Sequence, residues 1–230
     1  MQKITIKKIL KKKNKIPITC LTAYSEPVAK IADKYCDIIL VGDSLGMVLY
    51  GMKTTREVKI DTMILHCKTV KNSTKKSLVV FDMPYKTYTN KFIAYKNASK
   101  VMKLTKCDAI KLEGGKKIVN IIKYLTKKGI PVMGHVGLLP QTSSNFKVRG
   151  RNFVQRKKIF DDAKAISNSG VFAMVLECVV EDRYCRNLFV VGHRRQEYCD
   201  PLSRKSEGMR KFRNKNRVGI SGKTGNEIRV

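Results

Sequence analysis

Several features that define common protein classes are missing from this chain of 230 residues. No run approaches the roughly 18 consecutive apolar residues of a membrane-spanning helix, so we expect no transmembrane segment. The basic N-terminus has no apolar stretch of signal-peptide length. The seven cysteines are odd in number and form no C-x-x-C pair, which disfavours a disulfide framework and favours free thiols. Together these absences predict a cytoplasmic protein.

Acidic residues are scarce. The chain has 18 Asp and Glu against 48 Lys and Arg, and its formal net charge is +30 at pH 7. Such a balance is typical of nucleic-acid-binding proteins. Over residues 1–180, however, the lysines are scattered along the chain, which favours an ordinary solvated surface.

Six short apolar segments predict strands that are buried on both faces. They span residues 18–24, 37–44, 77–84, 109–115, 131–138 and 172–179. Helical patterns lie between them: from Ser25, around 61–70, from Asn90, over 118–125 and over 159–166. Strands that alternate with helices indicate right-handed crossovers and a parallel sheet. A doubly wound sheet and a (β/α)8 barrel both satisfy this pattern.

Two of the helices carry sharper predictions. The helix that follows Ser25 is expected to bury one face, made of Val28, Ile31, Ala32 and Tyr35. The helix over 118–125 has apolar residues at helical spacing, and Gly129 is expected to end it.

Five of the predicted strands end in a residue that can take part in chemistry. These residues are Asp43, Asp82, Glu113, His135 and Glu177. A carboxylate at the end of a buried strand is costly unless it is paired, protonated or bound to a metal. Barrel active sites use the C-terminal ends of many successive strands, whereas a doubly wound sheet concentrates ligands at one crevice. The row of strand-end residues therefore favours the barrel.

The three acids Asp43, Asp82 and Glu113 offer hard oxygen ligands from separate strands. Neighbouring carboxylates repel one another, and a divalent cation, Mg²⁺ for an all-oxygen set, relieves that repulsion. The metal-free alternative is ion pairing to Lys111, which lies two residues before Glu113 and shares its strand face.

The remaining strand-end residues suggest roles in proton transfer and substrate binding. Glu177 is placed to act as a general base. His135 either donates a hydrogen bond to a substrate oxygen or is a satisfied core residue. Ser44, next to Asp43, is placed to bind a substrate carboxylate. A metal, a lysine and a carboxylate base together suggest enolate chemistry on a 2-oxo acid.

The segments VGDSLGM, VVFDMPYKTY, KLEGG, GHVGL and VLECV, in this order, resemble the ketopantoate (3-methyl-2-oxobutanoate) hydroxymethyltransferase family, and the resemblance runs from about Ile16 to Val180. It implies a Mg²⁺-dependent (β/α)8 TIM barrel of the phosphoenolpyruvate/pyruvate type, usually a homodecamer. The implied reaction transfers a hydroxymethyl group from 5,10-methylenetetrahydrofolate to 3-methyl-2-oxobutanoate, giving 2-dehydropantoate in pantothenate biosynthesis.

The same resemblance implies roles for individual residues. Asp43 and Asp82 would be metal ligands, with Glu113 in or beside the metal shell. The substrate contacts would be Asp43, Ser44, Asp82, Lys111 and His135. Glu177 would be the proton acceptor.

Residues 181–230 break the pattern. The family continues with seventh and eighth strands, but only 188–193 is strand-like here, and the basic residues change from 31 Lys and 4 Arg before residue 181 to 4 Lys and 9 Arg after it. We interpret 181–230 as a non-homologous basic tail read in a shifted frame; the alternative is a genuine tail, disordered or RNA-binding. Residues 1–180 would then be an incomplete catalytic barrel that lacks its last two βα units, with two exposed strand edges.

Two other functions stay open on the residues alone. One is a different enolate-forming lyase or mutase barrel that acts on a 2-oxo acid, against which the combined motifs argue. The other is a non-catalytic nucleic-acid-binding protein that uses the Arg-rich tail, although the tail has few aromatic residues for stacking. We expect the partners to be a small 2-oxo acid, a folate and further copies of the chain, rather than nucleic acid or a membrane.

Overall fold

The computed structural model describes residues 2–13 and 15–180 of the chain. Within them, six strands form one parallel sheet in chain order. The strands are β1 (Cys20–Thr22), β2 (Ile38–Val41), β3 (Leu78–Asp82), β4 (Ala109–Glu113), β5 (Val132–Gly137) and β6 (Ala173–Glu177). The six predicted strands and their parallel pairing are therefore confirmed.

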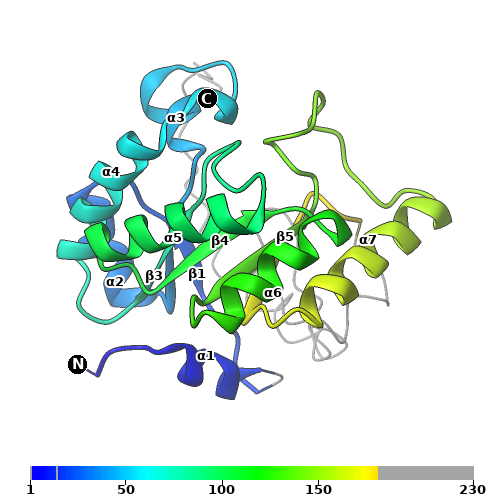
Figure 1. The fold of residues 1–230 in the computed structure, drawn as a ribbon. Coiled ribbons are helices and arrows are strands. Elements are labelled where there is room, and N and C mark those ends of the chain that lie inside the picture. The colour runs from blue at the N-terminus through cyan, green and yellow to red at the C-terminus, as the bar shows by residue number, and fades with distance from the viewer. Residues whose placement is uncertain (1, 14, 181–230) are drawn as a thin grey trace, which may run out of the picture.

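Helices connect successive strands and cover one face of the sheet (Figure 1). The longer crossover helices are α2 (Glu26–Tyr35), α4 (Ile60–Asn72), α5 (Lys91–Thr105), α6 (Val119–Lys127) and α7 (Phe153–Ser167). The shorter elements are α1 (Ile6–Lys12), α3 (Leu45–Tyr50), η1 (Thr55–Glu57) and η2 (Lys116–Ile118). Gly129 follows the end of α6 with a φ of 78°, as predicted for a helix-ending glycine.

The two faces of the sheet belong to two separate apolar clusters. Alternate residues such as Ile39, Val79 and Ile110 pack against the helices. Their neighbours, such as Ile38 and Leu78, are also buried, but pack with inward residues of the other strands. A sheet can bury its second face against itself only by curling, so the six strands form part of a barrel wall. This confirms the α/β barrel class.

The N-terminal segment closes the curled sheet at the end where the strands begin. Ile9 on α1 is fully buried in the inner cluster together with Ile4. The Ile4 N–H donates to the carbonyl of Lys76, just before β3, and Lys12 pairs with Asp37, just before β2. The basic N-terminus is therefore part of the barrel.

The predicted buried face of α2 is wrong for three of its four residues and confirmed for Ala32. Val28, Ile31 and Tyr35 are exposed, whereas Ala29 and Ala32 are buried. Both stripes have helical spacing, so the pattern alone does not choose between them. Two alanines allow α2 to approach α4 and β2 closely, and the larger apolar side chains point outward.

Residues 181–230, which come after β6, lie outside the described residues. The predicted absence of the last two βα units, the strand-like run at 188–193 and the shifted-frame interpretation of 181–230 therefore stay predictions. No helix in the described part of the chain is long and apolar enough to cross a membrane.

Candidate active site

The strand-end residues share the inner face of the sheet. Lys111 and Glu113 lie two and four residues after Ala109, which belongs to the inner cluster, and alternate strand residues share a face. Asp82 lies opposite Lys111 in the β3–β4 register, and His135 lies opposite Glu113 in the β4–β5 register. All four are buried. The prediction that the strand ends assemble one polar cluster is therefore confirmed for these residues.

Lys111 forms a buried ion pair with Asp82. Its Nζ lies 2.9 Å and 2.7 Å from the two carboxylate oxygens. Burial opposes the charge on Lys111, but Asp82 and the nearby Glu113 outweigh it and raise the lysine pKa. For Asp82 burial dominates and raises the pKa even though Lys111 opposes the shift. The cross-strand register explains why Lys111 pairs with Asp82 and not with Glu113, two residues further along its own strand.

Asp43 and Ser44 lie just after β2. Burial, followed by repulsion from Asp82, raises the pKa of Asp43 to about 8. The Asp43 N–H donates to Asp82 Oδ2 at 3.4 Å, which joins the ends of β2 and β3. Ser44 Oγ lies 2.6 Å from the Tyr24 hydroxyl, in the loop after β1. These contacts extend the cluster to the first three strands of the sheet.

His135 lies between two carboxylates. Its Nδ1 is 3.5 Å from Glu113 Oε1 and its Nε2 is 3.3 Å from Glu177 Oε2, at ion-pair distance. Neither ring nitrogen has a hydrogen-bond partner among the described residues, although the ring is buried. Both predicted roles of His135, donor to a substrate oxygen and satisfied core residue, stay predictions.

The charges around His135 are coupled. Burial and the Lys111 charge disfavour the imidazolium, but Glu113 and Glu177 outweigh them and raise the pKa of His135. Burial would raise the pKa of Glu113, but the contact with His135 outweighs it and lowers that pKa. Glu177 is less enclosed, since its side chain is 23% exposed. Protonation of His135 would therefore place a positive charge between the two acids.

Gln141 is a site residue that the sequence analysis missed. It lies in the loop between β5 and α7 and is buried, with hydrogen bonds to Asp43 and Glu113. The missed signal was a polar residue directly after the apolar run Leu138, Leu139 and Pro140, the same signal that marked the other strand ends.

The predicted metal ligands are not preassembled. Among the described residues, no group of three His, Cys, Asp or Glu side chains is arranged to hold a metal ion. The donor chemistry nevertheless fits a hard divalent cation, because three buried carboxylates, Asp43, Asp82 and Glu113, face one buried lysine. The pKa values of Asp43 and Asp82 are raised because burial disfavours their negative charge and the neighbouring groups do not fully compensate it.

The turn after Glu113 is fixed by α7. Asp162 accepts the Lys116 N–H at 2.9 Å, and a Cβ on Gly115 would lie 2.1 Å from the Asp162 carboxyl carbon. Residue 115 must therefore be glycine for this contact to form, which explains the second glycine of KLEGG.

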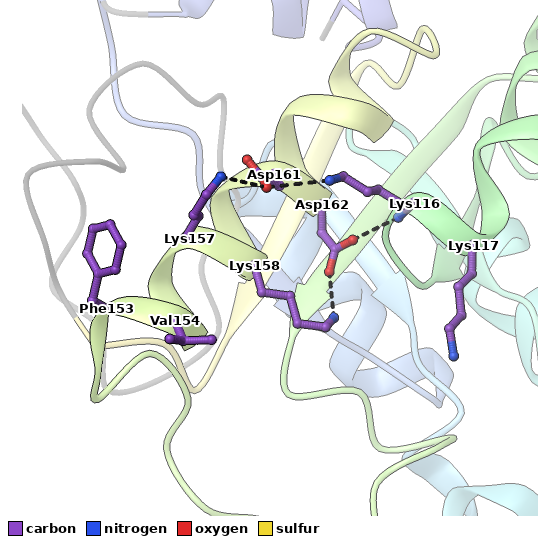
Figure 2. Close-up of a pocket in the computed structure, with 8 residues that line it drawn as sticks. All are labelled: Lys116, Lys117, Phe153, Val154, Lys157, Lys158, Asp161 and Asp162. Carbon is purple, nitrogen blue, oxygen red and sulfur yellow. Dashed lines mark hydrogen bonds and ion pairs between the residues drawn. The ribbon is translucent and has the colours of Figure 1, made fainter.

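A surface hollow of about 400 Å³ lies beside this turn, and Figure 2 shows the residues around it. Its lining consists of Lys116, Lys117, Phe153, Val154, Lys157, Lys158, Asp161 and Asp162. Asp161 lies within ion-pair distance of Lys116 and Lys157, and Asp162 pairs with Lys158. Since none of the strand-end residues lines the hollow, it is separate from the polar cluster.

Known proteins with similar sequences share one description. The chain is 56% identical over 176 residues to 3-methyl-2-oxobutanoate hydroxymethyltransferase of Pelagibacter ubique (strain HTCC1062), covering 75% of this chain and 68% of the relative. Its identity to the Rhizobium etli enzyme of the same name is 48% over 184 residues, covering 78% and 67%. For the Anaplasma marginale (strain Florida) enzyme it is 48%, covering 76% and 65%. The chain thus spans about two thirds of the length of these relatives.

Solved structures with a similar fold belong to distant proteins. Phosphonopyruvate hydrolase, in a complex with oxalate and Mg²⁺, matches with a TM-score of 0.61 and 11% identity over 92% of this chain and 88% of that one. Phosphoenolpyruvate phosphomutase from Streptomyces platensis subsp. rosaceus matches with a TM-score of 0.62 and 11% identity, over 92% and 84%. At this identity the likeness supports the fold alone, an α/β barrel.

The family model described as ketopantoate hydroxymethyltransferase matches residues 3–183, which include the whole polar cluster. Together with relatives of 46–56% identity, this match shows that the chain belongs to the ketopantoate hydroxymethyltransferase family.

Proposed function

We propose that the protein transfers a hydroxymethyl group from 5,10-methylenetetrahydrofolate to 3-methyl-2-oxobutanoate, giving 2-dehydropantoate for pantothenate biosynthesis. The observation that carries this proposal is the buried row of Asp82, Lys111, Glu113 and His135 on the inner face, in a chain of this family. A row of buried charges on a barrel's inner face is expensive in stability and fits a site for an anionic substrate.

The substrate's oxygens would be bound by three groups. The Lys111 ammonium provides fixed positive charge beside the 2-oxo group, where negative charge develops. The Ser44 hydroxyl, held by Tyr24, offers a hydrogen bond to the substrate carboxylate. The His135 ring, which lies 3.5 Å from Glu113 and 3.3 Å from Glu177, is the third group and would donate a ring N–H to a substrate oxygen. Asp43 and Asp82 complete the predicted contacts.

Glu177 would remove the proton from C3 of the 2-oxo acid. Its carboxylate is the most exposed of the strand-end acids, so a substrate can reach it, and its Oε2 lies 3.3 Å from His135 Nε2. Water converts 5,10-methylenetetrahydrofolate to formaldehyde and tetrahydrofolate: both C–N bonds of the methylene carbon break, that carbon takes the water oxygen, and the two water protons go to the two nitrogens. The electron pair of the broken C3–H bond then forms a bond from C3 to the formaldehyde carbon. The C=O π electrons move to the oxygen, which takes up a proton and becomes the hydroxyl group.

Asp43, Asp82 and Glu113 would hold Mg²⁺, which supplies Lewis-acid stabilisation of the substrate oxygens when bound. The hard donor set and its uncompensated charge support this assignment. The Mg²⁺ named for phosphonopyruvate hydrolase belongs to that protein, which shares the fold but little of the sequence.

Assembly and location are the remaining parts of the proposal. Large apolar side chains are exposed on three neighbouring helices: Val28, Ile31 and Tyr35 on α2, Val48, Leu49 and Tyr50 on α3, and Leu65 on α4. An apolar surface of this kind supports association with further copies of the chain. The five described cysteines are free thiols, which supports the cytoplasm as the compartment.

Neither alternative function is favoured. Relatives at about half identity carry the transferase name, whereas the solved structures of similar fold share 11% or less. The nucleic-acid alternative depends on residues 181–230, which lie outside the described part of the chain.

Deuterium exchange at C3 tests the first chemical step apart from the folate. The chain is incubated with 3-methyl-2-oxobutanoate and Mg²⁺ in D₂O, and loss of the C3 proton signal is followed by NMR. We expect exchange by the wild type and a loss of about 100- to 10,000-fold in Glu177→Gln. Equal exchange by both proteins would assign the base to another residue, and no exchange by a folded wild type would contradict the proposed function.

A further inference from the structure

Gln141 connects the ends of three strands from a loop that follows a fourth. Its side chain Nε2 donates to Asp43 Oδ2 at 2.8 Å, after β2, and to the Met83 carbonyl at 2.9 Å, after β3. Its backbone N–H donates to Glu113 Oε2 at 3.1 Å, at the end of β4. The residue is 1% exposed. Few single residues can hold two buried carboxylates that come from different strands.

The orientation of the Gln141 amide is determined by its partners. The Met83 carbonyl only accepts hydrogen bonds, so the amide nitrogen must face it, and the same nitrogen reaches Asp43 Oδ2. On the other side, the Tyr88 hydroxyl donates to Gln141 Oε1. Tyr88 also contacts the backbone of Glu113, whose N–H lies 3.3 Å from the hydroxyl. Both ends of the amide are therefore fixed, and Tyr88 links it to Glu113 a second time.

A neutral hydrogen-bond donor at position 141 can hold a carboxylate in place without neutralising its charge, which a lysine cannot do. Lys111 places a positive charge on Asp82, whereas the Gln141 amide and N–H fix Asp43 and Glu113 without neutralising them. The carboxylates keep the charge that a divalent cation requires, while one oxygen of each is held in place. Partners that hold metal ligands in this way commonly account for 10- to 100-fold in metal affinity.

We propose that Gln141 is a positioning residue that sets the placement of Asp43 relative to Glu113, and thereby the affinity for the divalent cation and the 2-oxo acid. The inference rests on the proposed function, because it assumes that these carboxylates bind the cation. Tyr88 acts in the same unit by fixing the amide.

The test measures Mn²⁺ binding directly, by the EPR signal of free Mn²⁺ with the full chain. Gln141→Met keeps the side-chain length and the backbone N–H but removes every amide hydrogen bond. We expect its Mn²⁺ affinity to fall by about 10- to 100-fold. The KM for the 2-oxo acid should rise, while the KM for the folate stays unchanged.

Ser77→Ala is the matched control. The Ser77 hydroxyl is fully buried and donates to the Cys36 carbonyl at 2.7 Å, at the opposite end of β3. This variant also loses one buried hydrogen bond and should melt at a lower temperature, with unchanged Mn²⁺ affinity. An equal loss of affinity in Ser77→Ala and Gln141→Met would overturn the proposal, because the effect would then follow general stability.

Tyr88→Phe decides the matter if Gln141→Met does not fold. It removes the donor to Gln141 Oε1 and the longer hydroxyl contacts with the Glu113 backbone, but it leaves the Gln141 amide and its hydrogen bond to Asp43. We therefore expect a smaller loss of Mn²⁺ affinity, about threefold. Unchanged affinity in Tyr88→Phe would overturn the proposal. Should the wild type itself bind no Mn²⁺, the proposed function fails first, whereas tight binding by both wild type and Gln141→Met contradicts the positioning role alone.

Discussion

Aspartates at the two ends of the sheet have opposite electrostatic surroundings. At the end where strands begin, Asp108 pairs with Lys3 and Lys71 and accepts the Val79 N–H. Asp33 accepts the N–H groups of residues 75–77 there. At the end where strands finish, Asp43 accepts a hydrogen bond from the neutral Gln141 amide, and Asp82 pairs with Lys111 but lies close enough to Asp43 to repel it.

The pKa values of these four aspartates differ in the same way. Burial would raise the pKa of Asp33 and of Asp108, but backbone donors for the first and lysines for the second outweigh it and lower both. Burial prevails at Asp43 and Asp82, whose pKa values are raised. Asp33 and Asp108 therefore contribute to stability, whereas Asp43 and Asp82 reduce it in exchange for a charged site.

The largest expected effect comes from Lys111→Met, which removes the buried partner of Asp82. We expect the free energy of unfolding to fall by about 3–5 kcal/mol at pH 8, because a buried charge is left unpaired. The loss should shrink at pH 5, where Asp82 can take up a proton. Urea denaturation at both pH values measures it, and a pH-independent loss would mean that packing and not charge explains the effect.

A smaller loss is expected from Asp108→Ala, about 1–2 kcal/mol, since the side chain is partly exposed and water screens its lysine pairs. Because the folded pKa of Asp108 is lowered, its contribution is present above the unfolded pKa, about 3.9, and disappears as pH falls through the folded value. Denaturation curves from pH 7 to pH 2 should converge for wild type and variant. Deuterium exchange at C3 should be retained, and its loss would contradict a purely structural role for this end of the sheet.

The smallest effect has the opposite sign. Asp43→Asn should stabilise the metal-free protein by about 1 kcal/mol at pH 9, because it removes a buried charge. The pKa of Asp43 is raised in the folded protein. Its carboxylate therefore lowers the free energy of unfolding more and more as pH rises from the unfolded pKa toward about 8. The gain should therefore vanish near pH 4. Thermal melts across this range, with and without Mn²⁺, show whether Asp43→Asn stabilises or destabilises the protein. Destabilisation at pH 9 without metal would contradict the proposed difference between the two ends of the sheet.

Much of the fold was predictable because buried parallel strands have continuous apolar sequences. The same reasoning located Asp82, Glu113 and His135 at one end of the sheet. The partner of Lys111 was not predictable, since it depends on the register between β3 and β4. The buried face of α2 was not predictable either, because two stripes with equal spacing compete.

The chemical roles of the strand-end residues stay predictions, and so does the tail. The family match ends at residue 183, close to the change from Lys to Arg. Sequencing the coding DNA tests the shifted frame: an alternative frame after Glu181 that encodes no further βα units would exclude it.

The closing segment around α1 also sets an order of events during synthesis. Ile4, Ile9 and Lys3 leave the ribosome first, but their partners at Lys76 and Asp108 emerge much later. The floor of the barrel therefore cannot form until more than a hundred residues have emerged. Removing these N-terminal residues would expose the inner apolar cluster to water at the end of the sheet where the strands begin.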